Sequence, residues 1–244
     1  PLLRPTEGGL QYYAPIINEN LYTNLWKGPY YGFHEVIDTF QLTDSPRRLR
    51  GLNLYYHFYS STKQASIKAM HDIYGFMREQ HPMSMWMSDY LDRLHGLYQA
   101  SMARTADGAW QIRGMDGLRT VRLDSQMGWP DLSRSQGIAG VRDLPQGRYV
   151  HLSSDRALLV LRPDRDGRPA LEEANLPLLE WRYLDDQRVN FSFAGQFDLT
   201  FSVRSASPCR VEVDGQRFTG KASAGLWTFQ LPMKQVSNGQ LVCN

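Results

Sequence analysis

Two patterns of apolar and polar positions follow each other along the chain. In the first, residues 52–59 form an uncharged, aromatic-rich run bounded by a turn, which predicts a buried strand. Helical spacing predicts one helix over 62–81 and a second from residue 88, with a short strand over 83–87 between them. Strand, helix, strand, helix is the order of an α/β layer with parallel strands. We therefore expect residues 1–105 to form an α/β segment.

Short alternating runs make up the second pattern. Asp-Gly pairs, which favour hairpins, stand between several of these runs, for example at 107–108 and 214–215. The pattern predicts an all-β sandwich or jelly roll over residues 106–244. The predicted strands are 109–113, 118–123, 148–152, 157–162, 179–183, 189–193, 197–203, 210–214 and 226–231.

Length, composition and charge limit the classes of function that the chain can have. With 244 residues and 42% hydrophobic residues, the chain can bury a core in one or two domains. Its 27 basic and 25 acidic residues give a net charge of +2, so we expect no nucleic-acid partner. Apolar runs fall short of the roughly eighteen residues of a membrane helix, so we expect no membrane span. Cys209 and Cys243 lie outside any CxxC motif and could form a disulfide or remain buried thiols.

His57 is the histidine most suited to chemistry. No two histidines are three or four residues apart, which argues against a two-histidine metal site on one helix. His57 lies near the carboxyl end of the strand predicted over 52–59, the edge where α/β proteins bind ligands. It could act there as a general acid or base. The alternative is a core histidine, whose replacement by Ala would cost stability rather than turnover.

Aromatic residues crowd the first sixty positions, which hold eight of the thirteen tyrosines. Between residues 18 and 33 these rings alternate with amide and carboxylate side chains. Rings that stack on a pyranose, beside amides that bond its hydroxyls, suit sugar recognition, whereas core packing is the alternative. The candidate substrate-binding residues are Asn18, Glu19, Asn20, Trp26, Tyr30, Tyr56 and Tyr59.

The segments TFQLTDSPRRL and YYHFYSSTK, with GLRTVRL, PDLSRSQGIAG and GRYVHL further on, resemble the PelA-like branch of the NodB-like polysaccharide deacetylases. These periplasmic enzymes of Pel biofilm polysaccharide synthesis remove acetyl groups from N-acetylhexosamine polymers on a (β/α) barrel-like fold. The resemblance implies that residues 1–105 are the end of such a barrel and that His57 protonates the departing amine. It also implies a periplasmic location and an acetylated polysaccharide as substrate.

Enzymes of this family hold a divalent metal, typically zinc, with an aspartate pair and an HxxxH motif. This chain contains no HxxxH and no matching aspartate pair. The resemblance therefore implies the C-terminal portion of a larger metal-dependent enzyme, with the metal held elsewhere and none bound by this chain. The periplasmic location also favours a Cys209–Cys243 disulfide.

Two further functions remain open for the β region. It could be a carbohydrate-binding module, or it could be a purely structural sandwich that supports the barrel or contacts an exopolysaccharide export protein. Exposed tryptophans would favour binding and buried ones would favour structure. The tryptophans in question are Trp110, Trp129, Trp181 and Trp227.

Overall fold

The structure is a computed structural model that describes residues 2–13, 17–44 and 51–244. Strands hold 41% of the residues and helices 23%, so the fold is mostly β. The chain divides into two compact units, unit 1 (Pro1–Pro82) and unit 2 (Met83–Asn244). Across the described ranges, no helix is both long enough and apolar enough to cross a membrane.

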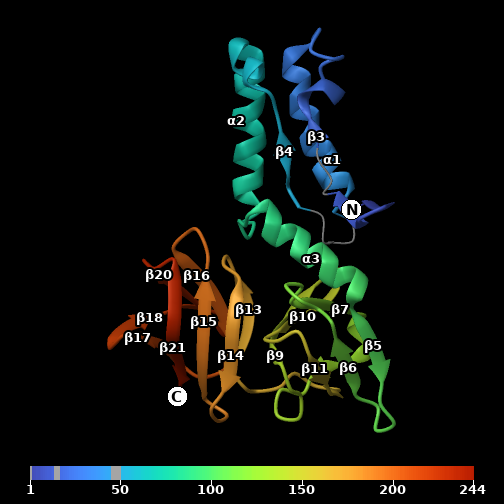
Figure 1. The fold of residues 1–244 in the computed structure, drawn as a ribbon. Coiled ribbons are helices and arrows are strands. Elements are labelled where there is room, and N and C mark those ends of the chain that lie inside the picture. The colour runs from blue at the N-terminus through green and yellow to red at the C-terminus, as the bar shows by residue number, and fades with distance from the viewer. Residues whose placement is uncertain (1, 14–16, 45–50) are drawn as a thin grey trace. The chain divides into compact units, whose positions relative to one another are not determined.

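Unit 1 combines two short parallel strands with helices. Strand β3 (Ile17–Asn18) pairs with β4 (Leu54–Tyr55), and helices α1 (Val36–Leu42) and α2 (Gln64–Glu79) accompany them (Figure 1). The core is small, and its buried members include Phe33. The remaining elements are the hairpin β1 (Leu2–Thr6) and β2 (Gly9–Tyr13) and the 3-10 helices η1 (Glu19–Leu21), η2 (Tyr30–Glu35) and η3 (Phe58–Thr62).

Two strand predictions before residue 105 are wrong. The buried strand over 52–59 is reduced to β4, and Tyr55 and Tyr56 are 46% and 39% exposed. The strand over 83–87 is absent, because α3 (Met87–Gln99) begins there and the preceding Trp86 is 63% exposed. An apolar run becomes a strand only where a neighbouring strand pairs with it, and these aromatic runs lie at the surface instead.

The boundary between the units differs in position from the change of sequence pattern. Unit 2 includes α3, which the pattern groups with residues 1–105. The helix predicted over 62–81 is confirmed as α2, whose buried Ala69 and Ile73 are four residues apart. Its apolar face thus packs on the core of unit 1, as helical spacing requires.

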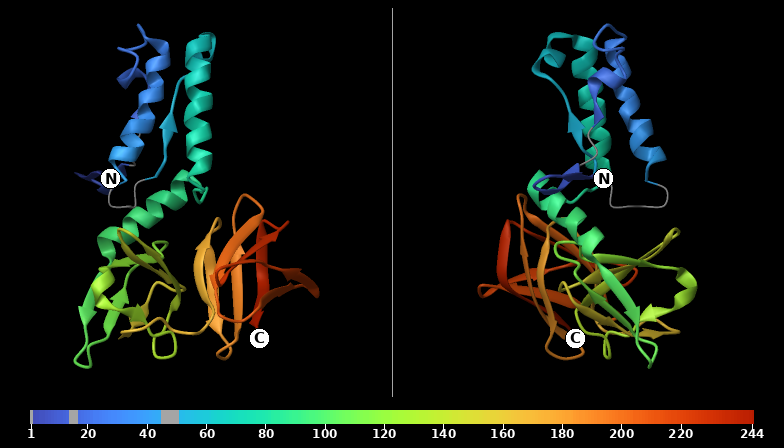
Figure 2. Two further views of the ribbon diagram at one scale, coloured as in Figure 1. Left: turned by 180° about the vertical axis from the view of Figure 1, so that it is seen from behind. Right: turned by 45° about the vertical axis from the view of Figure 1, so that its right-hand side comes forward.

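Unit 2 contains two facing sheets (Figures 1 and 2). Phe191 and Phe193 of one sheet meet Phe201 of the other, with ring centroids 5.2 and 5.5 Å apart. The larger sheet has the order β19 (Lys221–Ser223), β20 (Leu226–Leu231), β16 (Leu199–Arg204), β13 (Ala170–Ala174), β9 (Ile138–Leu144), β10 (Gly147–Leu152) and β7 (Thr120–Leu123). The smaller sheet has the order β14 (Leu178–Tyr183), β15 (Arg188–Ala194), β21 (Gln235–Cys243), β17 (Cys209–Val213) and β18 (Gln216–Thr219).

A second core cluster lies at the β7 end of the larger sheet, where Val150 and Leu152 of β10 are fully buried. Smaller sheets contribute Ile112 and Leu159 to this cluster. They are formed by β5 (Ser101–Arg104), β6 (Trp110–Arg113) and β11 (Ala157–Leu159), and by β8 (Trp129–Pro130) and β12 (Leu161–Arg162); a 3-10 helix, η4 (Ser125–Met127), precedes β8.

The β-rich prediction for residues 106–244 is confirmed, and the two facing sheets are compatible with a sandwich. Each predicted run contains a strand. Asp214 and Gly215 have φ values of 50° and 77°, as a two-residue hairpin loop between β17 and β18 requires. Cys209 and Cys243 face each other across β17 and β21 as a buried disulfide, so of the two alternatives the thiols are paired.

Candidate active site

The parallel pairing of β3 and β4 brings two candidate residues together. Glu19 directly follows β3, and His57 comes two residues after β4. Asn18 is in register with Tyr55, so both strands end at the same edge. The carboxyl edge of parallel strands is where α/β proteins place their ligands, and His57 lies at that edge in unit 1.

His57 is held by Glu19 through two contacts. Its Nδ1 lies 2.5 Å from Glu19 Oε1, and its backbone N–H donates to the same oxygen at 3.1 Å. The Glu19 side chain is completely buried, whereas that of His57 is 37% exposed. Glu19 therefore holds Nδ1 from the buried side, while the rest of the ring is partly open to solvent.

The carboxylate of Glu19 is kept ionised by these contacts. Burial acts to raise the pKa of Glu19, but the hydrogen bonds from the side chain and backbone of His57 outweigh it and hold the pKa below its usual value. The second carboxylate oxygen, Oε2, is buried and has no hydrogen-bond partner among the described residues. His57 is the side chain that pairs with the Glu19 carboxylate.

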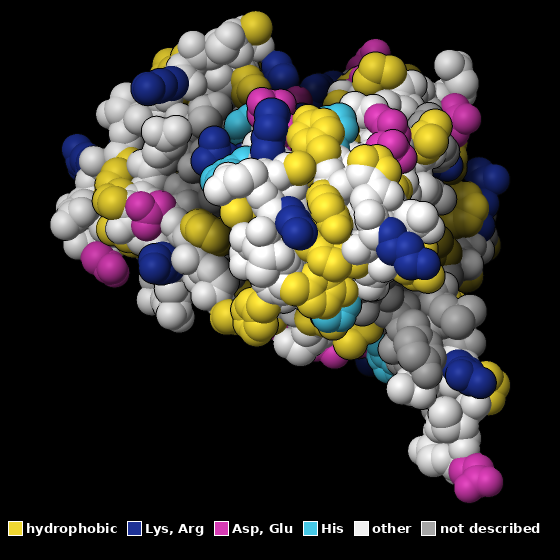
Figure 3. Space-filling view, turned by 90° about the horizontal axis from the view of Figure 1, so that it is seen from above, with side chains coloured by type: hydrophobic (Ala, Val, Ile, Leu, Met, Phe, Trp, Pro, Cys, Tyr) yellow, Lys and Arg dark blue, Asp and Glu magenta, His cyan; other side chains and the backbone are white. Residues whose placement is uncertain are grey.

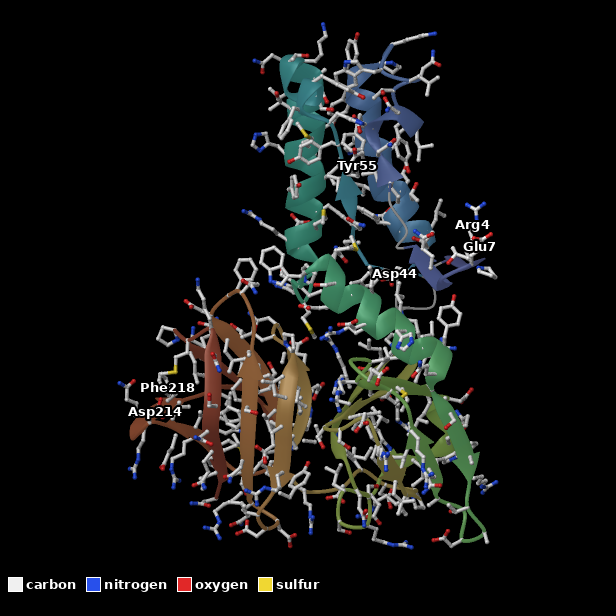
Figure 4. The ribbon with its side chains drawn as sticks, viewed as in Figure 1. Arg4, Glu7, Asp44, Tyr55, Asp214 and Phe218 are labelled. Atoms are coloured by element: carbon white, nitrogen blue, oxygen red, sulfur yellow. A yellow bond between two sulfur atoms is a disulfide. The ribbon has the colours of Figure 1, made fainter. Side chains whose placement is uncertain are left out.

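Glu19 also determines which ring nitrogen of His57 is free. A hydrogen bond from Nδ1–H to a carboxylate fixes the tautomer of a histidine. The hydroxyl of Tyr59 lies 3.0 Å from the same Nδ1. Among the described residues, Nε2 has only a long contact, 3.4 Å, to the hydroxyl of Tyr55, which Figure 4 labels on β4. Nε2 is thus the nitrogen that could exchange a proton with a bound molecule.

A chain of aromatic contacts begins at the imidazole of His57. Tyr59 stacks on His57 with a centroid distance of 4.8 Å and an interplanar angle of 7°. Trp26 lies 5.1 Å from Tyr59 and 4.8 Å from Tyr30. The ammonium of Lys63 lies 5.3 Å from the centroid of the Tyr30 ring. Figure 3 shows hydrophobic side chains and histidines at the molecular surface, and Tyr59 is 38% exposed.

A strained turn connects Glu19 to this aromatic group. Asn24, Leu25 and Trp26 have φ values of 48°, 52° and 63°, a region that costs non-glycine residues roughly 1–2 kcal/mol each. The buried Thr23 hydroxyl donates to the Glu19 carbonyl at 2.8 Å and accepts the Trp26 N–H at 3.2 Å. Such strain persists only where surrounding contacts impose it, and here it places Trp26.

The other candidates have more varied positions. Asn18 accepts the Asn20 N–H at 3.1 Å and so caps η1, while the Asn20 amide donates to the Tyr59 hydroxyl at 3.4 Å. Tyr56 instead bonds Tyr74 on α2, and burial together with that bond raises the pKa of Tyr74 to about 12. Sequence reasoning missed Tyr55 as a neighbour of His57. Period-two alternation along a strand, which puts residues 55 and 57 on one side, could have found it.

The tryptophans of the β region favour a structural role. Trp181 is 4% exposed and packs on Phe191. The other tryptophans proposed as platforms, Trp110, Trp129 and Trp227, are half-buried. Trp129 is covered by guanidinium groups, with Arg148 3.8 Å from the indole centroid. These rings are therefore poor stacking surfaces.

Residues 2–13, 17–44 and 51–244 were also compared with the requirements of a metal centre. They contain no cluster of three or more His, Cys, Asp or Glu side chains that could hold a metal ion. The described residues therefore do not fit the metal of the deacetylase family. No protein-family model, no curated protein and no solved structure matches this chain.

Proposed function

We propose that this chain is the C-terminal portion of a metal-dependent polysaccharide N-deacetylase of Pel-type biofilm synthesis, with His57 as its general acid. The observation that carries the proposal is the buried Glu19 carboxylate on Nδ1 of a partly exposed His57, at the carboxyl edge of two parallel strands. The substrate would be an N-acetylhexosamine polymer in the periplasm, as the sequence resemblance implies.

The proposed step is the collapse of the tetrahedral intermediate. Imidazolium Nε2–H of His57 donates its proton to the nitrogen of the departing amine while the carbon–nitrogen bond breaks and the acetate carbonyl forms. His57 is left neutral, and Glu19 compensates the positive charge that the ring carries before transfer. Because the described residues gather no metal ligands, we assign this chain the proton-donating part of the reaction only.

The exposure of β4 supports the assignment to a larger α/β domain. In parallel sheets both faces of a strand are normally covered. Tyr55, the last residue of β4, is 46% exposed. An exposed aromatic side chain is expected on a strand that further elements of a larger domain would cover.

The test is a His57→Asn variant of the longer enzyme that we propose contains this chain. The Asn amide can still donate to Glu19 from the position of Nδ1 but offers no titratable Nε2. Turnover on an acetylated hexosamine polymer should fall about 10²–10⁴-fold, the usual contribution of a positioned acid, with metal content and melting temperature unchanged. His71→Asn, at an exposed histidine of α2, is the matched control. Normal turnover of His57→Asn would remove His57 from the mechanism.

A further inference from the structure

The smaller sheet of unit 2 carries two β-bulges at one place, on either side of Ser192 in β15. On the β14 side the register shifts between Leu178 and Glu180. On the β21 side it shifts between Phe191 and Phe193. Bulges bend a strand and redirect side chains, and they are frequent beside functional sites. Two of them meeting at one residue make this the most irregular part of the sheet.

A hollow of about 270 Å³ lies beside the bulges. Gly239 is one of its lining residues. A Cβ there would come within 2.4 Å of the Phe191 ring, so only glycine fits at this position. Polar side chains provide most of the remaining lining: Glu180, Arg182, Asn190, Ser237, Asn238 and Gln240.

These polar groups belong to the outer face of the sheet. Their strand neighbours Trp181, Phe191 and Leu241 are buried in the core, so the alternate positions face away from it. Strand register aligns one residue from each of the five strands into a continuous polar row. The row runs Arg182, Asn190, Gln240, Glu212 and Arg217.

The chemistry of the hollow suits a neutral, hydroxyl-rich ligand. Arg182 and Glu180 form an ion pair at 3.3 Å, so their charges cancel, and both stay accessible, with side chains 60% and 51% exposed. The Gln240 amide donates to the Asn190 carbonyl oxygen at 3.3 Å, which leaves further donor and acceptor positions on both amides. Each sugar hydroxyl both donates and accepts, and this group of amides, guanidinium and carboxylate offers both functions.

We propose that this hollow binds one sugar ring of a neutral polysaccharide. The site does not depend on His57 or on the proposed deacetylase reaction. An anionic ligand would require uncompensated positive charge, and an apolar one would require an apolar lining. The binding face of the β region is therefore a polar sheet surface rather than a tryptophan platform.

The experiment is a calorimetric or NMR titration of the 244-residue chain with soluble tetramers of N-acetylglucosamine and of N-acetylgalactosamine. We expect one of these probes to bind, and Asn190→Ala/Gln240→Ala to weaken the affinity at least about tenfold, the size of a lost hydrogen-bonding pair. Arg182→Ala, a change at a largely exposed side chain, should weaken it too and serves as a second variant if the double variant melts early. Circular dichroism melting verifies the fold of each protein.

Two control variants test whether the loss of sugar affinity is specific to this hollow. Arg217→Ala changes the far end of the same polar row, and Gln187→Ala changes a larger hollow of about 410 Å³ elsewhere in unit 2. Both variants should bind as the unchanged protein does. The proposal is overturned if neither tetramer binds, if the Asn190 and Gln240 variants bind normally, or if a control variant loses affinity equally.

Discussion

His57 has features of two roles that sequence reasoning treats as alternatives. Its ring is accessible enough to donate a proton, and its Nδ1 also satisfies a carboxylate that is fully buried. Removing the side chain would leave the Glu19 charge buried without its partner, a situation that costs stability in most proteins. A loss of stability in His57→Ala would therefore say little about catalysis, which is why the Asn replacement is the informative one.

The lowered pKa of Glu19 predicts a specific dependence of stability on pH. A carboxylate whose pKa is lower in the folded than in the unfolded state stabilises the fold above its ordinary value, here 4.5. That contribution is lost as the pH falls from 4.5 toward the folded-state pKa. Glu19→Gln, which keeps an acceptor for His57 but cannot titrate, should flatten the acid side of the stability curve of unit 1.

Urea unfolding of Glu19→Gln and of the unchanged protein, at several pH values between 3 and 7, measures the difference in acid sensitivity. Glu35→Gln, a change at an exposed carboxylate of η2, is the control and should leave the acid side unchanged. Equal acid sensitivity of Glu19→Gln and the unchanged protein would contradict the account of Glu19.

The turn before Trp26 predicts an unusual response to glycine. Leu25 is 72% exposed and has a φ of 52°, so glycine there relieves backbone strain and loses little burial. Part of the gain is offset because glycine makes the unfolded chain more flexible. We expect Leu25→Gly to leave stability unchanged or to raise it by up to about 1 kcal/mol.

Leu21 provides a matched comparison, because it is 71% exposed but lies in η1. Glycine within a helical segment is destabilising, by roughly 0.5–1 kcal/mol, so Leu21→Gly should lower the midpoint of urea unfolding. If Leu25→Gly lowers the midpoint as much as Leu21→Gly does, the turn is not strained.

The disulfide between β17 and β21 predicts a stability difference confined to unit 2. It closes a loop with a sequence separation of 34 residues, worth about 3–4 kcal/mol in the chain-entropy account. Cys209→Ala/Cys243→Ala should lower the free energy of unfolding of unit 2 by about that amount, with the unit 1 transition unchanged. Free thiols detected by Ellman's reagent in the unfolded, unreduced protein would show that the bond does not form.

Sequence patterns predicted the elements whose determinants are local. Helix α2 follows from the spacing of Ala69 and Ile73, and the β17–β18 hairpin follows from Asp214 and Gly215. Pairing across long separations was not predictable in the same way. The short extent of β4 depends on what pairs with it, and the position of Gly239 against Phe191 depends on strand register. Register is fixed by packing across strands, which a single sequence does not display.

The candidate site also combines features that the sequence predicted with features that it did not. Sequence reasoning placed His57 near the carboxyl end of a longer strand, whereas it follows the short strand β4. It proposed Trp26, Tyr30 and Tyr59 as substrate-binding residues without placing them relative to His57. Glu19 was expected to bind substrate, whereas its side chain lies buried behind the imidazole. The contact joins residues 38 positions apart through the parallel pairing of β3 and β4, and no local pattern encodes it.

At the scale of the whole molecule, we propose a proton donor in a chain whose described residues offer no site for the metal that would activate a water molecule. A catalytic zinc normally has three protein ligands, and the described residues gather no such set. We therefore expect the purified 244-residue chain to release no acetate from an N-acetylhexosamine tetramer, either as prepared or with zinc added. The proposed longer enzyme should release acetate under the same conditions. Acetate release by the 244-residue chain alone would contradict the division of the reaction proposed here, because its residues would then have to activate water as well as donate the proton.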